Sequence, residues 1–450
     1  MAKAAAKSPE ALLSLPAAVL RDRLASGALS AIDLVEACIT RIEAREPEVQ
    51  AWAWFDADHA RRQARALDAH RATGRAIGPL HGLPVGLKDI IDTTRMPTGN
   101  GISVDADRIP MRDAYVAERL KAAGAIIMGK TVTTELAFMH PGKTRNPHNP
   151  DHTPGGSSSG SAAAVADGMI PLAVGTQTGG SVIRPAAFCG VTGFKPTFGA
   201  IPRRGVLMQS PTLDTIGVFA ADPVSAAMLA EVLFGHDEAD PATRPAPHPR
   251  LSDAATSEPP LKPVFALVRP PGWDEADQET KDAFAELAEA LGEQVFDVEL
   301  PRAFDNAAPE RQRINFAEMS RYYYRYWRDA KEILGQETIA AIEEGNATLA
   351  RDYLAALDWK PVLSAALGEI FERCDAILCP AAPGPAPEGL GSTGSAIFNG
   401  LWTFCGTPAV TLPILTSARG LPMGVQIVGP NGNDARLLRT ARWLFDWADQ

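Results

Sequence analysis

The sequence has few cysteines, no long hydrophobic run and a deficit of positive charge. Its five cysteines are scattered over 450 residues without a CxxC pair, which argues against a disulfide framework or a zinc site. No stretch of about 18 uninterrupted apolar residues occurs, so we expect no membrane-spanning helix. The formal net charge of −11 argues against a nucleic-acid partner, because binding to phosphate backbones depends on clustered lysine and arginine. The expected partner is a small molecule.

The first twenty residues, MAKAAAKSPEALLSLPAAVL, superficially resemble a secretion signal, since lysines precede an apolar stretch. Pro9, Glu10 and Pro16 interrupt that stretch, whereas a signal peptide needs an unbroken apolar core. We therefore expect a cytoplasmic protein whose cysteines are reduced and buried. Apolar residues make up 46% of the chain, which is enough to build a substantial core.

Short apolar segments alternate with amphipathic helical patterns along most of the chain. Residues 30–46 place apolar side chains on one helical face after a start with capping-box spacing, and further helices are expected near 113–123 and 158–167. The segments GLPVGLKDIIDT, GAIIMGKT and GMIPLAVGTQT are apolar runs closed by glycine or threonine, as buried strands often are. This alternation predicts an α/β fold.

Two later regions differ in character from the rest. Residues 235–263 are rich in proline and polar side chains and precede an expected strand–helix–strand unit. Residues 305–370 have mostly helical patterns and contain the aromatic segment RYYYRYW. We predict one continuous domain over residues 1–450, with a core at 10–235 and 375–445 and a helical, aromatic insertion at about 305–370.

Residues 152–190 concentrate five serines and eight glycines without the short repeats of a flexible linker. Within them, Thr178, Gly179, Gly180 and Ser181 are expected to form a turn. Two residues without Cβ let backbone N–H groups point at one spot beside a hydroxyl, which is what an oxyanion hole requires. The alternative is a tight strand-to-helix turn in which Ser181 only caps the next helix.

A serine nucleophile needs a base, and the eight histidines give no support for a histidine in that role. None follows His248 in the chain. Lys88 instead stands inside the apolar segment GLPVGLKDI, where burial would lower its pKa and leave a neutral amine that accepts a proton. Ser157, on the permissive backbone of GGSSSG, is placed to relay a proton between Lys88 and Ser181. The alternative for Lys88 is to snorkel from a strand end or to pair with Asp89.

Several segments together resemble the amidase signature family. In chain order they are GLPVGLKDIIDT, AGAIIMGKTVTTELAF, NPDHTPGGSSSGSAAAVA, TGGSVIRPAAFCGVTGFKPTFG, LDTIG, GTPAVTLPI and GLPMGVQIVGPNGNDARLL. The likeness covers most of residues 10–235 and 375–445. It implies a single amidase-signature domain with a large mixed, twisted β-sheet sandwiched between α-helices, and a hydrolase that cleaves carbonyl C–N bonds.

The resemblance also implies roles for individual residues. Ser181 is the nucleophile, Ser157 a bridging serine held by a cis peptide bond, and Lys88 the base. In the implied reaction Lys88 takes the Ser157 proton while Ser157 takes that of Ser181, whose Oγ attacks the substrate carbonyl and forms an acyl-enzyme. The N–H groups of residues 178–181 stabilise the oxyanion. This chemistry requires no metal and no organic cofactor.

Arg184 departs from the family pattern, in which an arginine often stands two residues after the nucleophile. We weigh two roles for it: binding a substrate carboxylate, to which a planar guanidinium is suited, or forming a buried structural ion pair. The remaining serines of the loop, Ser158, Ser159 and Ser161, are expected to support the backbone by hydrogen bonds.

The aromatic side chains of the insertion are candidates for the lining of the substrate pocket. They are Phe316, Tyr322, Tyr323, Tyr326 and Trp327. Such side chains form apolar cavities for aryl or alkyl groups, but aromatics at helical spacing also simply pack a core. The expected substrates are small-molecule amides, including aryl amides, with esters and carbamates (urethanes) as alternatives. A homodimer is compatible with the sequence.

Two rival functions remain open. The first is the A subunit of glutamyl-tRNA(Gln) amidotransferase, a glutaminase that serves a partner subunit. Thr215 argues against it, because it stands in SPTLDTIG where that subunit usually has glutamine. The second is a non-catalytic binding or scaffold relative, since a fold does not by itself imply an activity. The presence of Lys88, Ser157 and Ser181 argues against this second rival.

Overall fold

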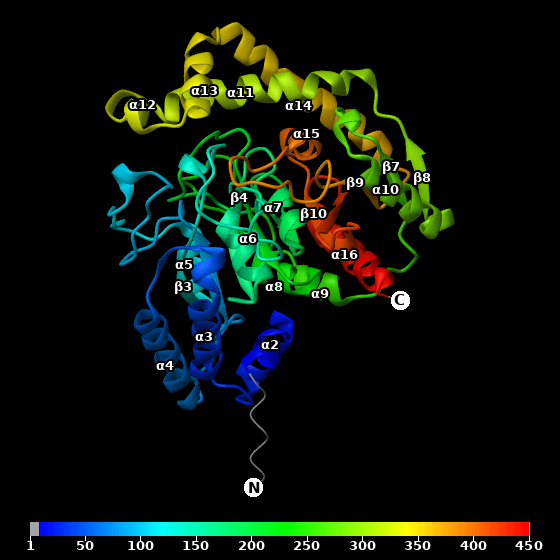
Figure 1. The fold of residues 1–450 in the computed structure, drawn as a ribbon. Helices are drawn as coiled ribbons and strands as arrows, with labels where there is room; N and C mark the ends of the chain where they lie inside the picture. Colours follow the sequence, from blue (N-terminus) through cyan, green and yellow to red (C-terminus); the bar gives the residue numbers. More distant parts are fainter. Residues whose placement is uncertain (1–8, 450) are drawn as a thin grey trace.

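The structure, a computed structural model, describes residues 9–449 and centres on one eleven-stranded sheet (Figure 1). The part of the N-terminal segment that precedes Pro9 lies outside the described residues. The strands are β1 (Trp52–Phe55), β2 (Pro84–Lys88), β3 (Ile126–Thr131), β4 (Leu172–Gln177), β5 (Thr192–Lys195), β6 (Thr215–Ala220), β7 (Phe265–Val268), β8 (Val295–Val298), β9 (Ala376–Pro380), β10 (Ala409–Thr416) and β11 (Pro422–Val428). Their spatial order is β1-β3-β2-β4-β6-β5-β10-β11-β9-β7-β8. The sheet is mixed, since β2 is parallel to β3 and β4 while β4 is antiparallel to β6.

Sixteen α-helices surround this sheet within residues 9–449. They are α1 (Pro9–Leu13), α2 (Ala17–Ser26), α3 (Ala31–Val49), α4 (Ala57–Ala72), α5 (Tyr115–Ala122), α6 (Ser159–Ala166), α7 (Ile183–Cys189), α8 (Pro223–Leu233), α9 (Leu251–Thr256), α10 (Gln278–Leu291), α11 (Ala307–Tyr322), α12 (Tyr324–Asp329), α13 (Gln336–Ala347), α14 (Ala350–Phe371), α15 (Ile397–Cys405) and α16 (Asp434–Ala448). One group, α6 and α7, packs together on the sheet, and α8, α9 and α16 form a second group on it. The predicted α/β fold with a sheet sandwiched between helices is confirmed. No helix in this part of the chain is both long and apolar enough to cross a membrane.

Most elements expected from the sequence are present. The helix predicted at 30–46 is α3, and the Ser30 hydroxyl caps it by accepting from the Asp33 N–H at 3.1 Å. The strand–helix–strand unit that follows residue 263 consists of the parallel strands β7 and β8 joined by α10. The polar stretch 235–263 also contains α9, which the sequence pattern did not predict. This short helix packs against α8 and α16, so tertiary contacts support it where local sequence does not.

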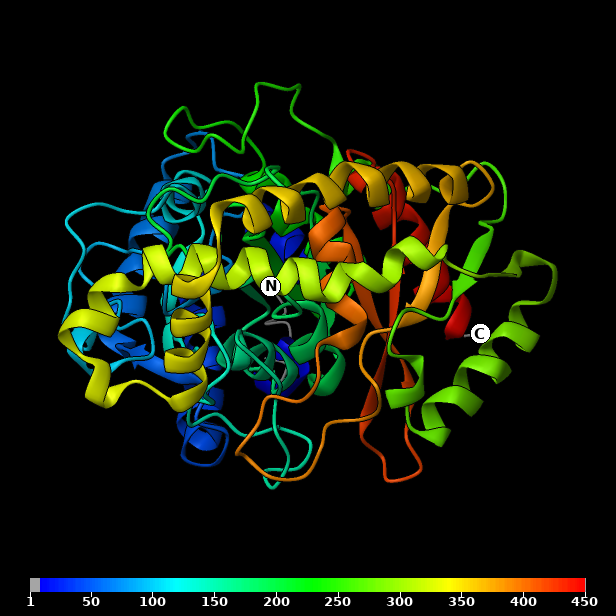
Figure 2. The same cartoon turned by 90° about the horizontal axis from the view of Figure 1, so that it is seen from above.

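The helical insertion predicted at about 305–370 is formed by α11 to α14. Figure 2 shows α11 and α14 side by side across the molecule, and the two helices contact each other. A buried apolar cluster joins Ile314 and Leu363 of the insertion to Trp402 of α15. The insertion is therefore anchored on α15, which belongs to the C-terminal part of the sheet domain.

The pairing of β2 with β3 contains a bulge that matters for the site. Val85 pairs with Ile127 but, three residues later on β2, Lys88 pairs with Thr131, so β3 contributes one extra residue. Successive strand residues point to opposite faces of a sheet. The bulge therefore places Lys88 and Lys130 on opposite faces, although without it they would lie side by side.

Candidate active site

Lys88 is the last residue of β2 and is fully buried. Its Nζ donates hydrogen bonds to the Ser157 hydroxyl oxygen at 2.7 Å and to the Thr176 hydroxyl oxygen at 2.8 Å. The sequence left open an ion pair between Lys88 and Asp89. In the structure the Asp89 carboxylate oxygen lies 3.6 Å from the Nζ of Lys130 instead. The interpretation of Lys88 as a surface-reaching or Asp89-paired lysine is therefore wrong.

The surroundings of Lys88 favour its neutral form. Burial lowers the pKa of Lys88 to about 7, while the Asp214 carboxylate opposes this shift and the Arg184 cation adds to it. The cause is the loss of the water that stabilises a charged amine. A substantial part of Lys88 is uncharged at neutral pH, and an uncharged amine can accept a proton.

Ser157 lies in the loop that leads into α6, and its peptide bond with Gly156 is cis. The three neighbouring hydroxyls, those of Ser158, Ser159 and Ser161, each donate to a backbone carbonyl of this loop or of β4. Their predicted role as supports of the loop is confirmed. Among the serines of GGSSSGS, the one in contact with Lys88 is Ser157.

Arg184 of α7 binds two backbone carbonyls. Its Nη2 donates to the carbonyl of Gly156 and its Nη1 to that of Gly394, each at 2.6 Å. No carboxylate within residues 9–449 pairs with it, so the predicted ion pair is wrong. The guanidinium instead holds the peptide group that directly precedes Ser157, while its buried Nε has no hydrogen-bond partner within residues 9–449.

Ser181 belongs to the loop between β4 and α7. Gln177, at the end of β4, shapes this loop because its Oε1 accepts from the N–H groups of the last loop residue and of the first residue of α7, at 2.8 and 3.0 Å. Ser181 is 9% exposed, and its hydroxyl forms no hydrogen bond with any residue from 9 to 449. The structure thus joins Lys88 to Ser157 directly and leaves Ser181 free of both. Hydrogen bonds in ligand-free sites often tighten only when substrate binds.

The predicted oxyanion loop has free donors and, at Gly180, little room for a side chain. The backbone N–H groups of Gly179, Gly180 and Ser181 donate to no described residue between 9 and 449. A Cβ added to Gly180 would come within 2.4 Å of the Asn399 Oδ1 of α15, so a larger residue would collide with that side chain. One added to Gly179 would lie 3.5 Å from the Nη1 of Arg311. The loop therefore presents unpartnered N–H groups beneath α15 and α11.

Asp214 supports this loop from the other side. The Thr178 hydroxyl donates to its Oδ1 at 2.5 Å, and the N–H groups of Gln209 and Ser210 donate to its Oδ2 at 2.8 and 2.9 Å. Burial raises the pKa of Asp214 to about 6, and these hydrogen bonds oppose the rise. The segment LDTIG carries part of the family resemblance, but the sequence predicted no role for its aspartate. The reason is that Thr178, its hydrogen-bond partner, lies 36 residues away in the chain.

The aromatic side chains of the insertion form a packed cluster. Tyr323 is fully buried, and its hydroxyl donates to the carbonyl of Leu136 at 2.5 Å. Trp327 is half-buried and stacks on Tyr324, with ring centroids 6.1 Å apart. Tyr323 therefore packs the core, as the alternative interpretation expected, and its hydroxyl already has a hydrogen-bond partner. The role of Trp327 in binding substrate stays a prediction.

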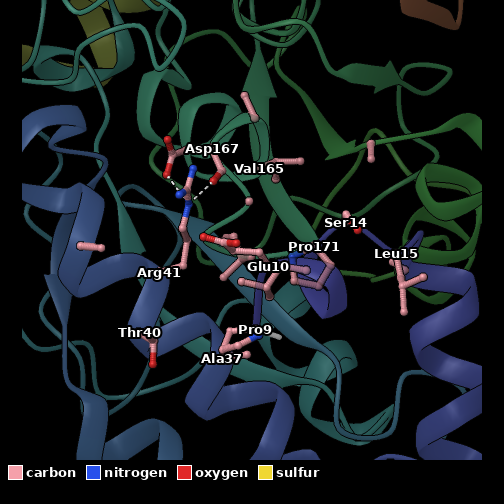
Figure 3. A pocket seen from close by; sticks show the side chains of 17 residues that line it. Pro9, Glu10, Ser14, Leu15, Ala37, Thr40, Arg41, Val165, Asp167 and Pro171 are labelled. Atoms are coloured by element: carbon pink, nitrogen blue, oxygen red, sulfur yellow. Dashed lines mark hydrogen bonds and ion pairs between the residues drawn. The ribbon is translucent and has the colours of Figure 1, made fainter. Parts of the chain in front are cut away.

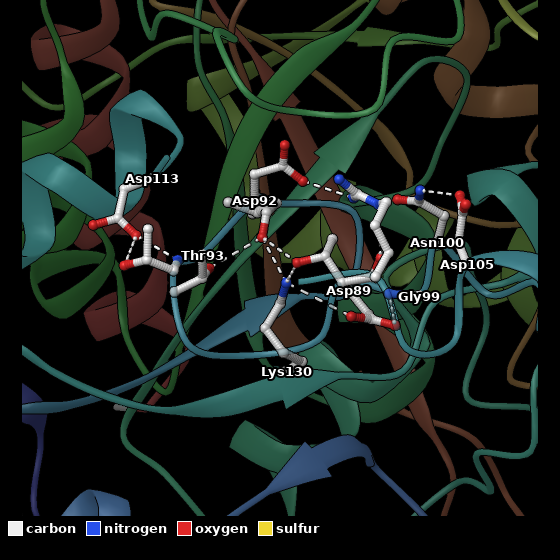
Figure 4. A network of polar contacts seen from close by, with 12 residues as sticks. Asp89, Asp92, Thr93, Gly99, Asn100, Asp105, Asp113 and Lys130 are labelled. Atoms are coloured by element: carbon white, nitrogen blue, oxygen red, sulfur yellow. Dashed lines mark hydrogen bonds and ion pairs between the residues drawn. The ribbon is translucent and has the colours of Figure 1, made fainter. Parts of the chain in front are cut away.

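Lys130, on the opposite face, lies in a separate polar network (Figure 4). Its Nζ donates to the Ile91 carbonyl at 2.5 Å and to the Thr98 hydroxyl at 2.7 Å, and lies 3.6 Å from Asp89. Burial lowers the pKa of Lys130 to about 8, and the Asp89 carboxylate opposes the shift. This network holds the loop that follows β2 and contains no serine that contacts the amine.

Two cavities differ sharply in their relation to these residues. A cavity of about 10 Å³ touches Thr178 and Asp214, which is roughly the room that one water needs. A cavity of about 680 Å³ lies between α1, α3 and the end of α6, where Glu10, Arg41 and Asp167 line it (Figure 3). The larger cavity contains none of the candidate catalytic residues, so its size does not make it the active site.

Comparisons with known proteins agree with this geometry. A model of the amidase family matches residues 33–438. The A subunit of the glutamyl-tRNA(Gln) amidotransferase of Chloroflexus aurantiacus is 33% identical over 473 residues, covering 95% of this chain and 96% of the relative. The corresponding protein of Streptomyces coelicolor is 34% identical over 471 residues, covering 95% of each chain.

Solved structures resemble the chain over nearly its full length. The peptide amidase of Stenotrophomonas maltophilia has a TM-score of 0.83 at 29% identity, covering 97% of both chains. A 6-aminohexanoate cyclic dimer hydrolase has a TM-score of 0.84 at 28% identity, covering 97% of this chain and 98% of that one. The sheet, the buried lysine and the serine- and glycine-rich loops thus define a hydrolase of carbon–nitrogen bonds. The chain belongs to the amidase signature family.

Proposed function

We propose that the protein hydrolyses small-molecule amides through an acyl-enzyme, with Ser181 as nucleophile, Ser157 as proton relay and Lys88 as base. The observation that carries this proposal is the 2.7 Å contact between Lys88 and Ser157. It joins a fully buried amine, whose pKa is lowered to about 7, to a hydroxyl on the loop that the family pattern assigns to catalysis. General-base catalysis is most effective when the pKa of the base lies near the working pH.

The proton path follows from this contact. With Lys88 neutral, the Ser157 hydroxyl donates to Nζ across the same distance, and Ser157 in turn accepts the proton of Ser181. The Ser181 Oγ attacks the substrate carbonyl, and the C–N bond breaks as Ser157 returns a proton from Lys88 to the departing nitrogen. Water then repeats the sequence on the acyl-enzyme and releases the acid.

The loop that carries Ser181 supplies the stabilisation of the oxyanion. The N–H groups of Gly179, Gly180 and Ser181 have no partner in the described chain, and Thr178 is tied to Asp214. Preorganised donors of this kind lower the barrier because they need no rearrangement during the reaction, and the loss of one typically costs about 10²–10³-fold in rate. Arg184 contributes by holding the carbonyl of Gly156.

The same attack applies to esters and to carbamates, which we include as side substrates. The proposed partner is a small molecule, and the proposed compartment is the cytoplasm. The reaction as written uses side chains, backbone N–H groups and water.

A second candidate function rests on a specific observation, the similarity to amidotransferase A subunits over 95% of the chain. Glutamine carries a primary amide, so the same residues would release ammonia from it. This candidate requires glutamine hydrolysis that depends on a partner subunit or on tRNA. Co-purification of a second subunit with the protein would support it.

The deciding experiment compares the wild type with Ser181→Ala on five classes of substrate. Anilides, primary aliphatic amides, aryl esters, aryl carbamates and glutamine are incubated with each protein, and the released amine or alcohol is quantified. Ser257→Ala, at an exposed serine after α9, is the matched control. We expect hydrolysis of the amide classes by the wild type and the control and none by Ser181→Ala. Equal turnover by Ser181→Ala would contradict the proposal.

A further inference from the structure

The side chain of Arg311, on α11, lies between α15 and the proposed oxyanion loop. Its guanidinium packs against Gly400 of α15, where an added Cβ would lie 2.7 Å from Nε and 3.2 Å from Cζ. On another side, its Nη1 is 3.5 Å from the position of a Cβ on Gly179. The absence of a side chain at Gly400 thus makes room for this cation, which also lies beside Gly179 of the oxyanion loop.

The guanidinium has no partner. Its Nε is shielded from solvent without a hydrogen bond, and no hydrogen bond or ion pair reaches Arg311 from any residue between 9 and 449. The nearest acidic residue along the helix, Glu310, is paired with Arg313. Burial lowers the pKa of Arg311, and no carboxylate opposes that shift.

Two arginines that are buried as whole residues differ in this respect. Arg203 is 3% exposed and forms a bidentate ion pair with Asp240, in which Nε and Nη2 donate to the two carboxylate oxygens at 2.9 and 2.7 Å. Each terminal nitrogen of Arg184 donates to a backbone carbonyl. Arg311 is half-buried, and a polar nitrogen shielded from water without a partner is costly. The fold itself thus gives its shielded Nε nothing to bind.

We propose that Arg311 binds a carboxylate of the substrate, so that the enzyme acts on amides that carry a negative charge. This inference rests on the proposed function, since Arg311 stands beside the loop whose N–H groups would hold the substrate carbonyl. A guanidinium suits a carboxylate because its planar fork donates two parallel hydrogen bonds. The carboxylate belongs either to the acyl part or to the amine part of the substrate.

Substrate pairs that differ by one charge test this inference. Succinamic acid places the carboxylate on the acyl part and N-butanoylglycine on the amine part, whereas butyramide is the neutral counterpart. We expect the wild type to prefer one of the two acids over butyramide. In Arg311→Met the ratio of kcat/KM for that acid to kcat/KM for butyramide falls by about 10²-fold, as is usual when a shielded charge pair loses one member. Arg311→Lys retains part of the preference.

Arg321→Met is the matched control, because Arg321 lies on the same helix but is exposed and contacts Tyr322. We expect this variant to keep the wild-type ratio. If butyramide is hydrolysed as well as both acids, or if Arg311→Met lowers all three rates equally, the inference is overturned while the amidase function stands.

A binding measurement separates failure of the inference from failure of the proposed chemistry. Calorimetric titration of Ser181→Ala with succinamic acid and with N-butanoylglycine measures recognition without turnover. We expect binding of one acid to Ser181→Ala and its loss in the double variant Ser181→Ala/Arg311→Met. Binding that survives in the double variant contradicts the role of Arg311. If the wild type hydrolyses no amide but binding still depends on Arg311, the proposed role of Arg311 is supported and the proposed chemistry is overturned.

Discussion

Two fully buried lysines on neighbouring strands illustrate how differently this protein uses the same side chain. Lys88 and Lys130 both donate to a threonine hydroxyl, at 2.8 and 2.7 Å. Lys130 also lies 3.6 Å from the Asp89 carboxylate, whereas the other hydrogen bond of Lys88 goes to Ser157. Burial lowers the pKa of both, to about 7 for Lys88 and about 8 for Lys130.

We infer from this difference that the two amines have separate roles, Lys88 as the proposed base and Lys130 as a structural cation. A carboxylate close to Lys130 stabilises its charged form, so this amine is suited to hold the loop that follows β2. Lys88 faces hydroxyls, and the carboxylate that influences it, Asp214, forms no hydrogen bond or ion pair with it. The predictions below test whether the two lysines divide catalysis and stability in this way.

The largest expected effect is that of Lys88→Met on catalysis. Removing the base should lower kcat/KM for amide hydrolysis by roughly 10²–10⁴-fold, the usual contribution of general-base catalysis. The fold should persist, because the substitution removes a buried amine that has no ion-pair partner. Initial rates on an anilide, together with urea unfolding, measure both quantities. A variant with more than about a tenth of the wild-type rate would show that Lys88 is not the base.

The matching change on the other face, Lys130→Met, should act on stability. It leaves the buried Asp89 without a counter-charge, and breaking a buried pair on one side typically costs about 3–5 kcal/mol. The free energy of unfolding in urea measures the loss. Lys130→Met/Asp89→Asn should recover part of it, because the neutral amide no longer needs a cation. An unchanged free energy of unfolding in Lys130→Met would refute the structural role.

The pH dependence of catalysis distinguishes the two amines in the unmodified enzyme. Only neutral Lys88 accepts a proton, so kcat/KM should rise about tenfold per pH unit on the acidic side and level off above about pH 7. A midpoint near 8 would instead match Lys130. An optimum below about pH 6 contradicts a neutral lysine base of either kind.

The smallest expected effect is that of Asp214→Asn on this profile. The Asp214 carboxylate raises the pKa of Lys88, so its neutralisation should lower that pKa and move the acidic limb of kcat/KM to lower pH by up to about one unit. Asp253→Asn, at an exposed aspartate of α9, serves as control. A shift toward higher pH would mean that Asp214 does not act on Lys88 through its charge.

Much of the site was predictable because its parts are local in sequence. A lysine inside an apolar strand indicates burial, and glycines beside a serine indicate close backbone approach, so Lys88, Ser157 and Ser181 stood out. Asp214 and Arg311 did not stand out, because their proposed roles depend on contacts with residues such as Thr178 and Gly179 that lie far away along the chain. Tyr323 was expected in the pocket, but the carbonyl of Leu136 binds its hydroxyl inside the core.

The sequence by itself determined most of the elements, α9 excepted, and the kind of chemistry, since hydrophobic period, capping residues and glycine spacing act over a few residues. Only the tertiary structure decided which side chains meet. The single bulge between β2 and β3 turns Lys88 toward Ser157 and Lys130 toward Asp89, and the packing of α11 on α15 brings an unpaired Arg311 over the oxyanion loop. Register and helix packing depend on contacts between distant segments, which no local pattern encodes.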